Sequence, residues 1–182
     1  MRVATGLWSL TQKEVKGVYE IALQDLLVDK LKEIFKDYSL LAKSGELQTV
    51  QVFPQFLPQP EGITIREKKN DHGIVPQGYQ VEDIESLFPC VLVKVEGSHD
   101  NISRSLRKTS IDVRIIVGAY DNSQDCQGYR DVLNILSKIK IELLTLPGYI
   151  LDERFRLHND LLVTQLLDDR EWPYFFGTIE TV

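Results

Sequence analysis

The stretch from 88 to 146 constrains the fold of this chain most strongly, because two strand patterns and a helix pattern follow one another there. The sequence CVLVKVE places three valines on one face, and TSIDVRIIVGAY places four β-branched residues on one face. Alternation with period two predicts strands with one buried face. The opposite face carries charges, which solvent or a neighbouring subunit would meet. The buried set is Val91, Val93, Val95, Ile111, Val113, Ile115 and Val117, and the charged set is Lys94, Glu96, Asp112 and Arg114.

An amphipathic helix is expected after the second strand. Residues 120–123 predict a turn, and Asp125 is the expected N-cap of a helix that runs to about Leu146. Pro147 and Gly148 end the pattern. The apolar residues recur every three or four positions, as on the buried side of a helix. They are Tyr129, Val132, Leu133, Ile135, Leu136, Ile139 and Leu143.

The remaining patterns complete an α+β reading. A helix is expected from Tyr19 to about Tyr38, a short strand in LQTVQVF, and three late strands around 155–157, in DLLVTQLL and in YFFGTIETV. The order lacks regular βαβ alternation, which favours an antiparallel or mixed sheet with helices packed on one face, a two-layer fold. All 182 residues fit a single domain. A Pro- and Gly-rich loop or arm is expected at about 54–86, where Gly62 to Arg66 could form a hairpin.

Composition excludes several classes of protein. A net charge of −6 and a pI near 5.1 argue against a protein that grips nucleic acid, which needs clustered Lys and Arg. No stretch approaches the roughly 20 apolar residues of a membrane span. The first residues lack a secretory-signal pattern. Cys90 and Cys126 fit packing roles in a reducing compartment better than a disulfide framework, so we expect synthesis in the cytoplasm.

The sequence contains no recognisable catalytic motif. His72, His99 and His158 lack the spacing of a zinc site and are expected at the surface. The acidic groups around Asp121, Asp152 and Asp168 fit turns better than an Mg²⁺ site, and no phosphate-binding glycine loop is present. We therefore expect a non-enzymatic protein with no catalytic residue, no metal and no cofactor.

Two features stand out as candidate contact surfaces. The polar segment from Gly97 to Lys108 is expected to form a flexible arm, and Arg104, Arg107 and Lys108 give it a local positive charge on an acidic chain. It fits a solvated loop and a subunit interface about equally well. The aromatic run near the end is typical of hairpin packing, although aromatic residues are also enriched where subunits meet. Gly177 within this run predicts a bulge or a close backbone approach.

The sequences FPCVLVKVEG, TSIDVRIIVGAYD, GYRDVLNILSKIKIELL and WPYFFGTIET together resemble the tail terminator, or tail completion, proteins of long-tailed bacteriophages and prophages. The resemblance covers 88–182 well and the first helix and strand more loosely. Its most distinctive parts are the turn IIVGAYD into GYRDVLNIL and the final aromatic hairpin. The loop at 54–86 is longer and richer in proline than the minimal pattern of this family, so its contacts are unassigned.

The resemblance implies a structural subunit of a six-membered ring at the head-proximal end of the tail. Such a ring stops polymerisation of the tail tube and joins the tail to the head. Its implied partners are copies of itself, the tail-tube protein and a head-completion or connector protein, while DNA passes through the lumen without sequence-specific binding. The protein would occupy the host cytoplasm during assembly and then the virion tail. The candidate interface residues are Arg104, Leu106, Arg107, Lys108, Trp172 and Tyr174.

Two alternatives remain open. Another virion connector, such as a neck or head-closure protein, would share a small α+β architecture. A small metal-dependent nuclease or hydrolase would instead use the acidic groups near Asp121 and Asp168.

Overall fold

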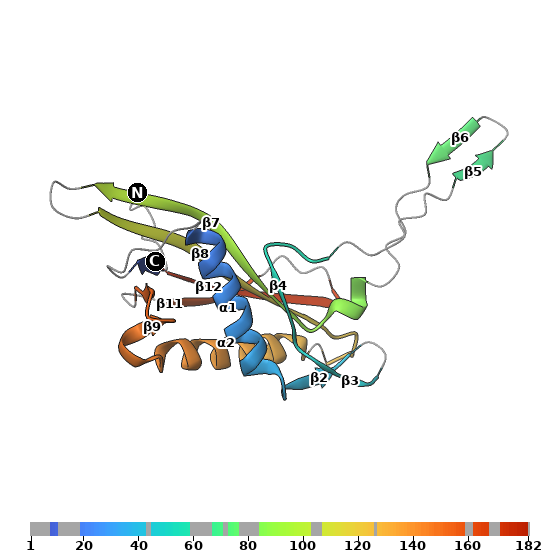
Figure 1. The fold of residues 1–182 in the computed structure, drawn as a ribbon. Coiled ribbons are helices and arrows are strands. Elements are labelled where there is room, and N and C mark those ends of the chain that lie inside the picture. The colour runs from blue at the N-terminus through green and yellow to red at the C-terminus, as the bar shows by residue number, and fades with distance from the viewer. Residues whose placement is uncertain are drawn as a thin grey trace.

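In the computed structural model, one large sheet carries two α-helices on one of its faces (Figure 1). The structure describes residues 8–10, 19–42, 45–58, 67–70, 73–76, 84–102, 107–125, 127–158, 162–167 and 172–181. This architecture confirms the α+β, two-layer prediction. It also shows that the sheet is mixed, because one of its strand pairs is parallel.

The described helices and strands have the following bounds. The helices are α1 (Tyr19–Phe35), α2 (Gly128–Leu144) and the 3₁₀ turns η1 (Ile84–Leu87) and η2 (Pro147–Tyr149). The first strands are β1 (Trp8–Leu10), β2 (Ser39–Leu41), β3 (Leu47–Thr49), β4 (Gln51–Pro54), β5 (Glu67–Asn70) and β6 (Gly73–Pro76). The later strands are β7 (Cys90–Ile102), β8 (Arg107–Tyr120), β9 (Ile150–Leu151), β10 (Phe155–Leu157), β11 (Leu162–Leu167) and β12 (Tyr174–Thr181).

The long antiparallel pair β7–β8 is the centre of the main sheet. On the β7 side, β4 adds a parallel strand. On the β8 side, β12 pairs antiparallel with the second half of β8, and β11 pairs antiparallel with the far side of β12. β1, β10 and β9 continue the sheet from the first half of β8. Two antiparallel hairpins, β2–β3 and β5–β6, form separate small sheets. The expected strand in LQTVQVF is thus divided between β3 and β4.

The polar segment expected as a flexible arm is largely a β-ribbon. Ladder pairs continue from Gly97↔Asp112 to Ile102↔Arg107, so only residues 103–106 lie outside the described part of the hairpin. A β-bulge between Val95 and Gly97 adds one residue to β7. In Figure 1 this end of β7–β8 extends beyond the two helices. The prediction of a flexible arm was therefore wrong for most of its length, because polar side chains do not prevent a backbone ladder on a two-stranded ribbon.

The core lies between the sheet and the two helices. The predicted sheet set is buried at Val91, Val93, Ile111, Val113, Ile115 and Val117, whereas Val95 is half-buried. α1 packs against β4 and β7, and α2 packs against β8, β12 and β11. Full burial of a Leu or Ile side chain contributes about 1.5–3 kcal/mol. The helix residues that fill this layer are Leu23, Leu27, Val28, Leu31, Phe35, Val132, Ile135, Leu136, Ile139 and Leu143.

The start of α2 corrects two predictions. The backbone N–H of Gly128 donates to the Oδ2 atom of Asp121 at 2.8 Å, so Asp121 and not Asp125 satisfies this helix end. Tyr129 and Leu133, which were expected on the buried side, are more than a third exposed. They lie at the border of the apolar stripe, where spacing alone does not decide burial.

The region at 54–86 contains a described hairpin, β5–β6, and the turn η1. The hairpin expected at Gly62 to Arg66 lies outside the described residues. Among the described residues, no helix is both long and apolar enough to cross a membrane.

Candidate assembly surface

The main sheet has a second face, opposite α1 and α2, that no described helix covers. Strand pairing places side chains from β4, β7, β8 and β12 on it, because the alternate residues of these strands form the core. The sequence prediction of a charged second face at Lys94, Glu96, Asp112 and Arg114 is confirmed by this register. We call this surface the open face and define it by Phe53, Leu92, Lys94, Glu96, Asp112, Arg114, Ile116, Phe176, Thr178 and Glu180.

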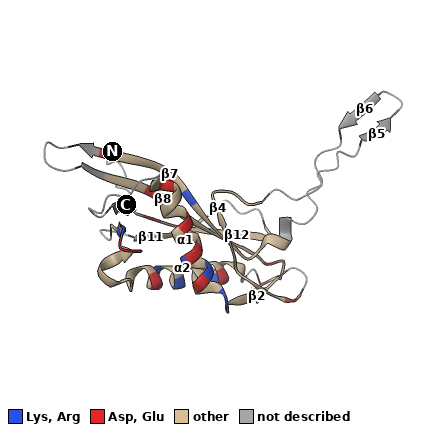
Figure 2. Ribbon diagram, viewed as in Figure 1, with Lys and Arg blue, Asp and Glu red and all other residues tan. Residues whose placement is uncertain are grey.

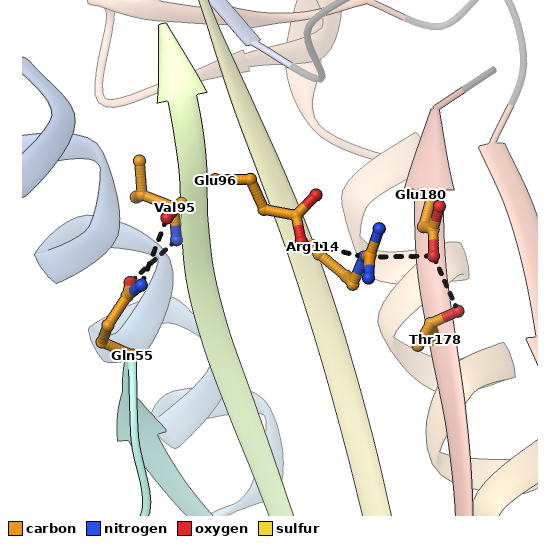
Figure 3. A network of polar contacts seen from close by, with 6 residues as sticks. All are labelled: Gln55, Val95, Glu96, Arg114, Thr178 and Glu180. Atoms are coloured by element: carbon orange, nitrogen blue, oxygen red, sulfur yellow. Dashed lines mark hydrogen bonds and ion pairs between the residues drawn. The ribbon is translucent and has the colours of Figure 1, made fainter. Parts of the chain in front are cut away.

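Charged groups cross the open face from one strand to the next (Figure 3). The Nε atom of Arg114 on β8 lies 3.2 Å from a carboxylate oxygen of Glu96 and 3.2 Å from one of Glu180. These distances make ion pairs, although Arg114 Nε is not aligned for a hydrogen bond to either group. The Thr178 hydroxyl donates to Glu180 at 3.2 Å. The row therefore joins β7, β8 and β12 and has one more negative than positive charge.

The polar row continues onto the β7–β8 ribbon. His99 Nε2 lies 2.9 Å from Asp112 Oδ2, and the imidazole is mostly exposed. On the other side of the ribbon, the Ser98 hydroxyl donates to Glu20 of α1 at 2.6 Å, and the Thr109 hydroxyl donates to Asp100 at 2.7 Å. The ribbon is thus held to the helix layer on one side and presents the pair His99 and Asp112 on the other.

The middle of the open face is apolar and half-buried. Phe53, Leu92 and Ile116 lie side by side there, in the register of β4, β7 and β8. Next to them, Phe56 is 71% exposed, and the ammonium group of Lys94 lies 6.0 Å from the centre of its ring. A face with apolar side chains between charged neighbours is suited to a protein partner, because interfaces combine an apolar centre with a polar rim.

An aromatic cluster closes one end of this face. The ring of Tyr174 lies 5.1 Å from that of Phe88 and 5.5 Å from that of Tyr120, centre to centre, and Phe88 also packs on Phe176 at 5.9 Å. Burial, followed by the charge of Tyr120, raises the pKa of Tyr174. The candidate interface residue Tyr174 is therefore half-buried within its own subunit, whereas Trp172 is 60% exposed.

Two of the remaining candidate interface residues, Arg107 and Lys108, lie at the beginning of β8. Arg107 and Lys108 belong to β8, and their backbones pair with Ile102 and Asn101. Arg104 and Leu106 lie outside the described residues. Arg107 and Lys108 thus lie at one end of β8, whereas Tyr174 pairs with Tyr120 at the other end, two residues after Trp172 in the sequence. The described candidates therefore form two separate groups.

Two of the three acidic groups considered as metal ligands contain a carboxylate with a structural partner. Asp121 accepts hydrogen bonds from the backbone N–H groups of Ser123 and Gly128, and Asp152 pairs with Arg154. Asp168 lies outside the described residues. Within the described part of the chain, no three His, Cys, Asp or Glu side chains are grouped so that they could hold a metal ion.

Two residues of the surface were missed by the sequence prediction. Glu180 completes the charged row, and Gln55 bonds the backbone of β7 beside that row (Figure 3). Alternation within YFFGTIETV could have placed Glu180 on the same face as Phe176 and Thr178. Acidic and basic residues also occur along α1 and α2 (Figure 2), so charge is not confined to the open face.

None of the known protein-family models matches this chain, and no curated protein matches it.

Proposed function

We propose that this protein is a structural subunit of a ring that terminates a phage or prophage tail, stops polymerisation of the tail tube and joins the tail to the head. The observation that carries the proposal is the open face: a broad half-apolar surface with charges at its edges, on a sheet whose other face is filled by helices. The resemblance of 88–182 to the tail terminator family supplies the biological setting.

A ring requires a heterologous contact, in which one surface of a subunit binds a different surface of its neighbour until the circle closes. The chain offers two different surfaces of this kind. One is the open face, and the other is the projecting β7–β8 ribbon with its basic residues Arg107 and Lys108. A basic ribbon tip complements the excess acid of the Glu96, Arg114 and Glu180 row. We therefore assign the tip as the group that reaches the next subunit.

The proposed partners are further copies of this chain, the tail-tube protein and a head-completion or connector protein. An acidic chain suits a lumen through which DNA passes without being gripped, because it offers few groups to neutralise phosphates. The same surfaces would serve a neck or head-closure protein. Which end the ring binds separates these two virion roles.

Electron microscopy of particles made with and without this protein tests the proposal. Loss of the protein is expected to give tails of irregular length without attached heads, and added protein is expected to cap tail tubes. Binding to head portals with no effect on tube length would instead assign a neck role. Normal tails in its absence would overturn both.

The contribution of the ribbon is tested separately with the double substitution Arg104→Glu, Arg107→Glu. Ring formation, followed by light scattering and electron microscopy in the presence of tail tubes, is expected to be lost. The matched control is Lys32→Glu, Lys36→Glu, which changes the net charge equally at exposed positions in and just after α1. Unchanged assembly of the ribbon variant would remove the ribbon from the interface.

A further inference from the structure

The outer edge of β11 is unpaired in the part of the chain that the structure describes. β11 pairs with β12 on one side, and among the described residues no strand pairs with its other side. Its six residues, LVTQLL, include no charge, proline or glycine. Edge strands usually carry such residues because an uncharged, regular edge pairs readily with another strand. At the opposite border of the sheet, β4 ends in Pro54, which lacks the N–H group needed to extend a ladder.

The sequence of β11 is nearly self-complementary in the antiparallel direction. If two copies pair about Thr164, then Thr164 faces its own counterpart, Leu162 faces Leu166, and Val163 faces Gln165. We propose that β11 is a dimerisation strand that pairs antiparallel with β11 of a second copy, with Thr164 on the twofold axis. This inference does not depend on the proposed ring, because it concerns a contact in which both copies use the same surface.

The twofold axis runs perpendicular to the sheet, so both copies keep their helices on the same side of one continuous sheet. Leu162, Thr164 and Leu166 lie on the helix side, since their β12 partners Ile179 and Gly177 face the core. The pairing would therefore place Leu162 of one copy beside Leu166 of the other, under the helices. A slip of one residue would turn the second copy over and place its helices on the opposite side of the sheet, which distinguishes the proposed register from its neighbours.

The neighbouring side of α2 carries exposed leucines in addition to Lys140. The ammonium group of Lys140 reaches the backbone carbonyl of Leu162 at 3.4 Å, so this side of the helix lies over the beginning of β11. Leu133 and Leu144 share that side at helical spacing, and their exposed fractions are 36% and 38%. A second copy on β11 would approach these residues together with Leu167, which is 41% exposed on the other side of the strand. The edge of β11 and this side of α2 thus add exposed leucine side chains to the proposed contact.

Thr164 itself has an unused hydroxyl group. Its Oγ1 atom is buried and has no hydrogen-bond partner in the described part of the structure. Threonine residues directly opposite one another on antiparallel strands form stabilising cross-strand pairs. A rotation about the Cα–Cβ bond would let the two hydroxyl groups on the axis bond each other.

Disulfide trapping tests the register. In a Cys126→Ser background, Thr164→Cys places two thiols directly opposite, where Cα atoms are about 4.5–5.5 Å apart and a disulfide can form. The matched control is Val163→Cys, whose two copies would be about 8 Å apart along the diagonal. Rapid covalent dimer formation by Thr164→Cys, and slow formation by Val163→Cys, is the expected result on a non-reducing gel. Equal or reversed rates would overturn the register.

Dissociation is tested with Val163→Lys, Gln165→Lys. In the free subunit the first lysine lies next to Glu180, its partner on β12, so the fold gains a favourable charge pair. In the dimer each new lysine faces one from the other copy, which is expected to raise the dissociation constant about tenfold. Multi-angle light scattering over a concentration series measures this constant, and circular dichroism verifies that the variant is folded. A wild-type protein that stays monomeric at every concentration, or a variant that dimerises equally well, would overturn the proposal.

Discussion

The side-chain amide of Gln55 bonds both backbone groups of Val95. Its Oε1 atom accepts from the Val95 N–H at 3.0 Å, and its Nε2 atom donates to the Val95 carbonyl at 3.2 Å (Figure 3). β4 ends at Pro54, so Gln55 continues the ladder along β7 with a side chain in place of a backbone. The residue holds a φ of 57°, a left-handed conformation that costs a residue with a Cβ atom some stability. Two hydrogen bonds to Val95 and one from Gln24 offset that cost.

Replacement of Gln55 by alanine is expected to lower the free energy of unfolding by about 1–3 kcal/mol, because partly buried polar groups of Val95 and Gln24 lose their partners. Gln55→Gly is expected to lose about 1 kcal/mol less, since glycine adopts positive φ without strain. Urea unfolding measures both, with the exposed Gln124→Ala as a control. Equal losses for the alanine and glycine variants would contradict the role of backbone strain.

Removal of the Asp121 carboxylate is expected to destabilise the protein by about 1 kcal/mol, as for loss of a helix cap. Burial acts to raise the pKa of Asp121, but hydrogen bonds from Ser123, Gly128 and Gln127 together outweigh it and lower the pKa below its ordinary value of 3.8. This stabilisation is complete above 3.8 and is lost as pH falls through the lower folded-state pKa. The stability difference between wild type and Asp121→Ala is therefore expected to disappear in strong acid.

Asp125→Ala is the matched control for this experiment, because Asp125 is exposed and the helix end is satisfied by Asp121. It is expected to change stability by less than about 0.5 kcal/mol. Burial and then the charge of Asp121 raise the pKa of Asp131. Asp121→Ala removes this repulsion between the two carboxylates, so part of the loss in stability will be offset. A larger effect of Asp125→Ala than of Asp121→Ala would show that the cap is misassigned.

A side chain at Gly177 is expected to disturb the packing of α2 on β12. A Cβ atom there would lie 2.7 Å from Leu136 Cδ1 and 2.8 Å from Val132 Cγ1, both of which belong to fully buried residues. Gly177→Ala is therefore expected to cost about 1–3 kcal/mol, measured by thermal unfolding. The control is Gly97→Ala at the bulge, where a Cβ atom would meet nothing within 4 Å. Equal melting temperatures for the two variants would contradict the close approach.

The thiol of Cys90 is expected to be unreactive in the folded protein. Burial raises its pKa to about 12, and a hydrogen bond from the backbone of Gly118 lowers it less. Compared with an ordinary cysteine, this leaves about a thousandfold less thiolate near pH 8. In Cys126→Ser, labelling by a thiol reagent should therefore require unfolding, and addition of urea should release it. Rapid labelling without urea would contradict the buried position.

Sequence periodicity was sufficient to predict the layers. Strand alternation at 91–95 and 111–117 placed the core face, and the charged residues Lys94 and Arg114 were correctly assigned to the other face. These predictions succeed because period-two and period-3.6 patterns depend only on neighbouring residues. The close approach at Gly177 was also expected, although no bulge occurs in its pairing with β8.

Contacts between distant segments could not be predicted in the same way. The parallel pairing of β4 with β7, and the bond from Gln55 to Val95, join residues about 40 positions apart that share no local pattern. The cap at Gly128 was assigned to the nearest acidic residue, Asp125, because sequence rules favour short range, but the turn brings Asp121 there instead. For the candidate surface, strand alternation predicted the charged residues Lys94, Glu96, Asp112 and Arg114. The ion pair between Arg114 and Glu180 became visible only from the pairing of the strands.

The extra residue near Glu96 changes the phase of the whole outer ribbon. Before it, even-numbered residues of β7 such as Leu92 and Lys94 point away from the helices, and beyond it odd-numbered ones such as His99 do so. A single-residue deletion at this point would rotate every later side chain of β7 by half a turn, exchanging His99 with Ser98 and Asp100. One inserted amino acid thus decides which half of the polar sequence is shown to a neighbour and which half ties the ribbon to its own helix.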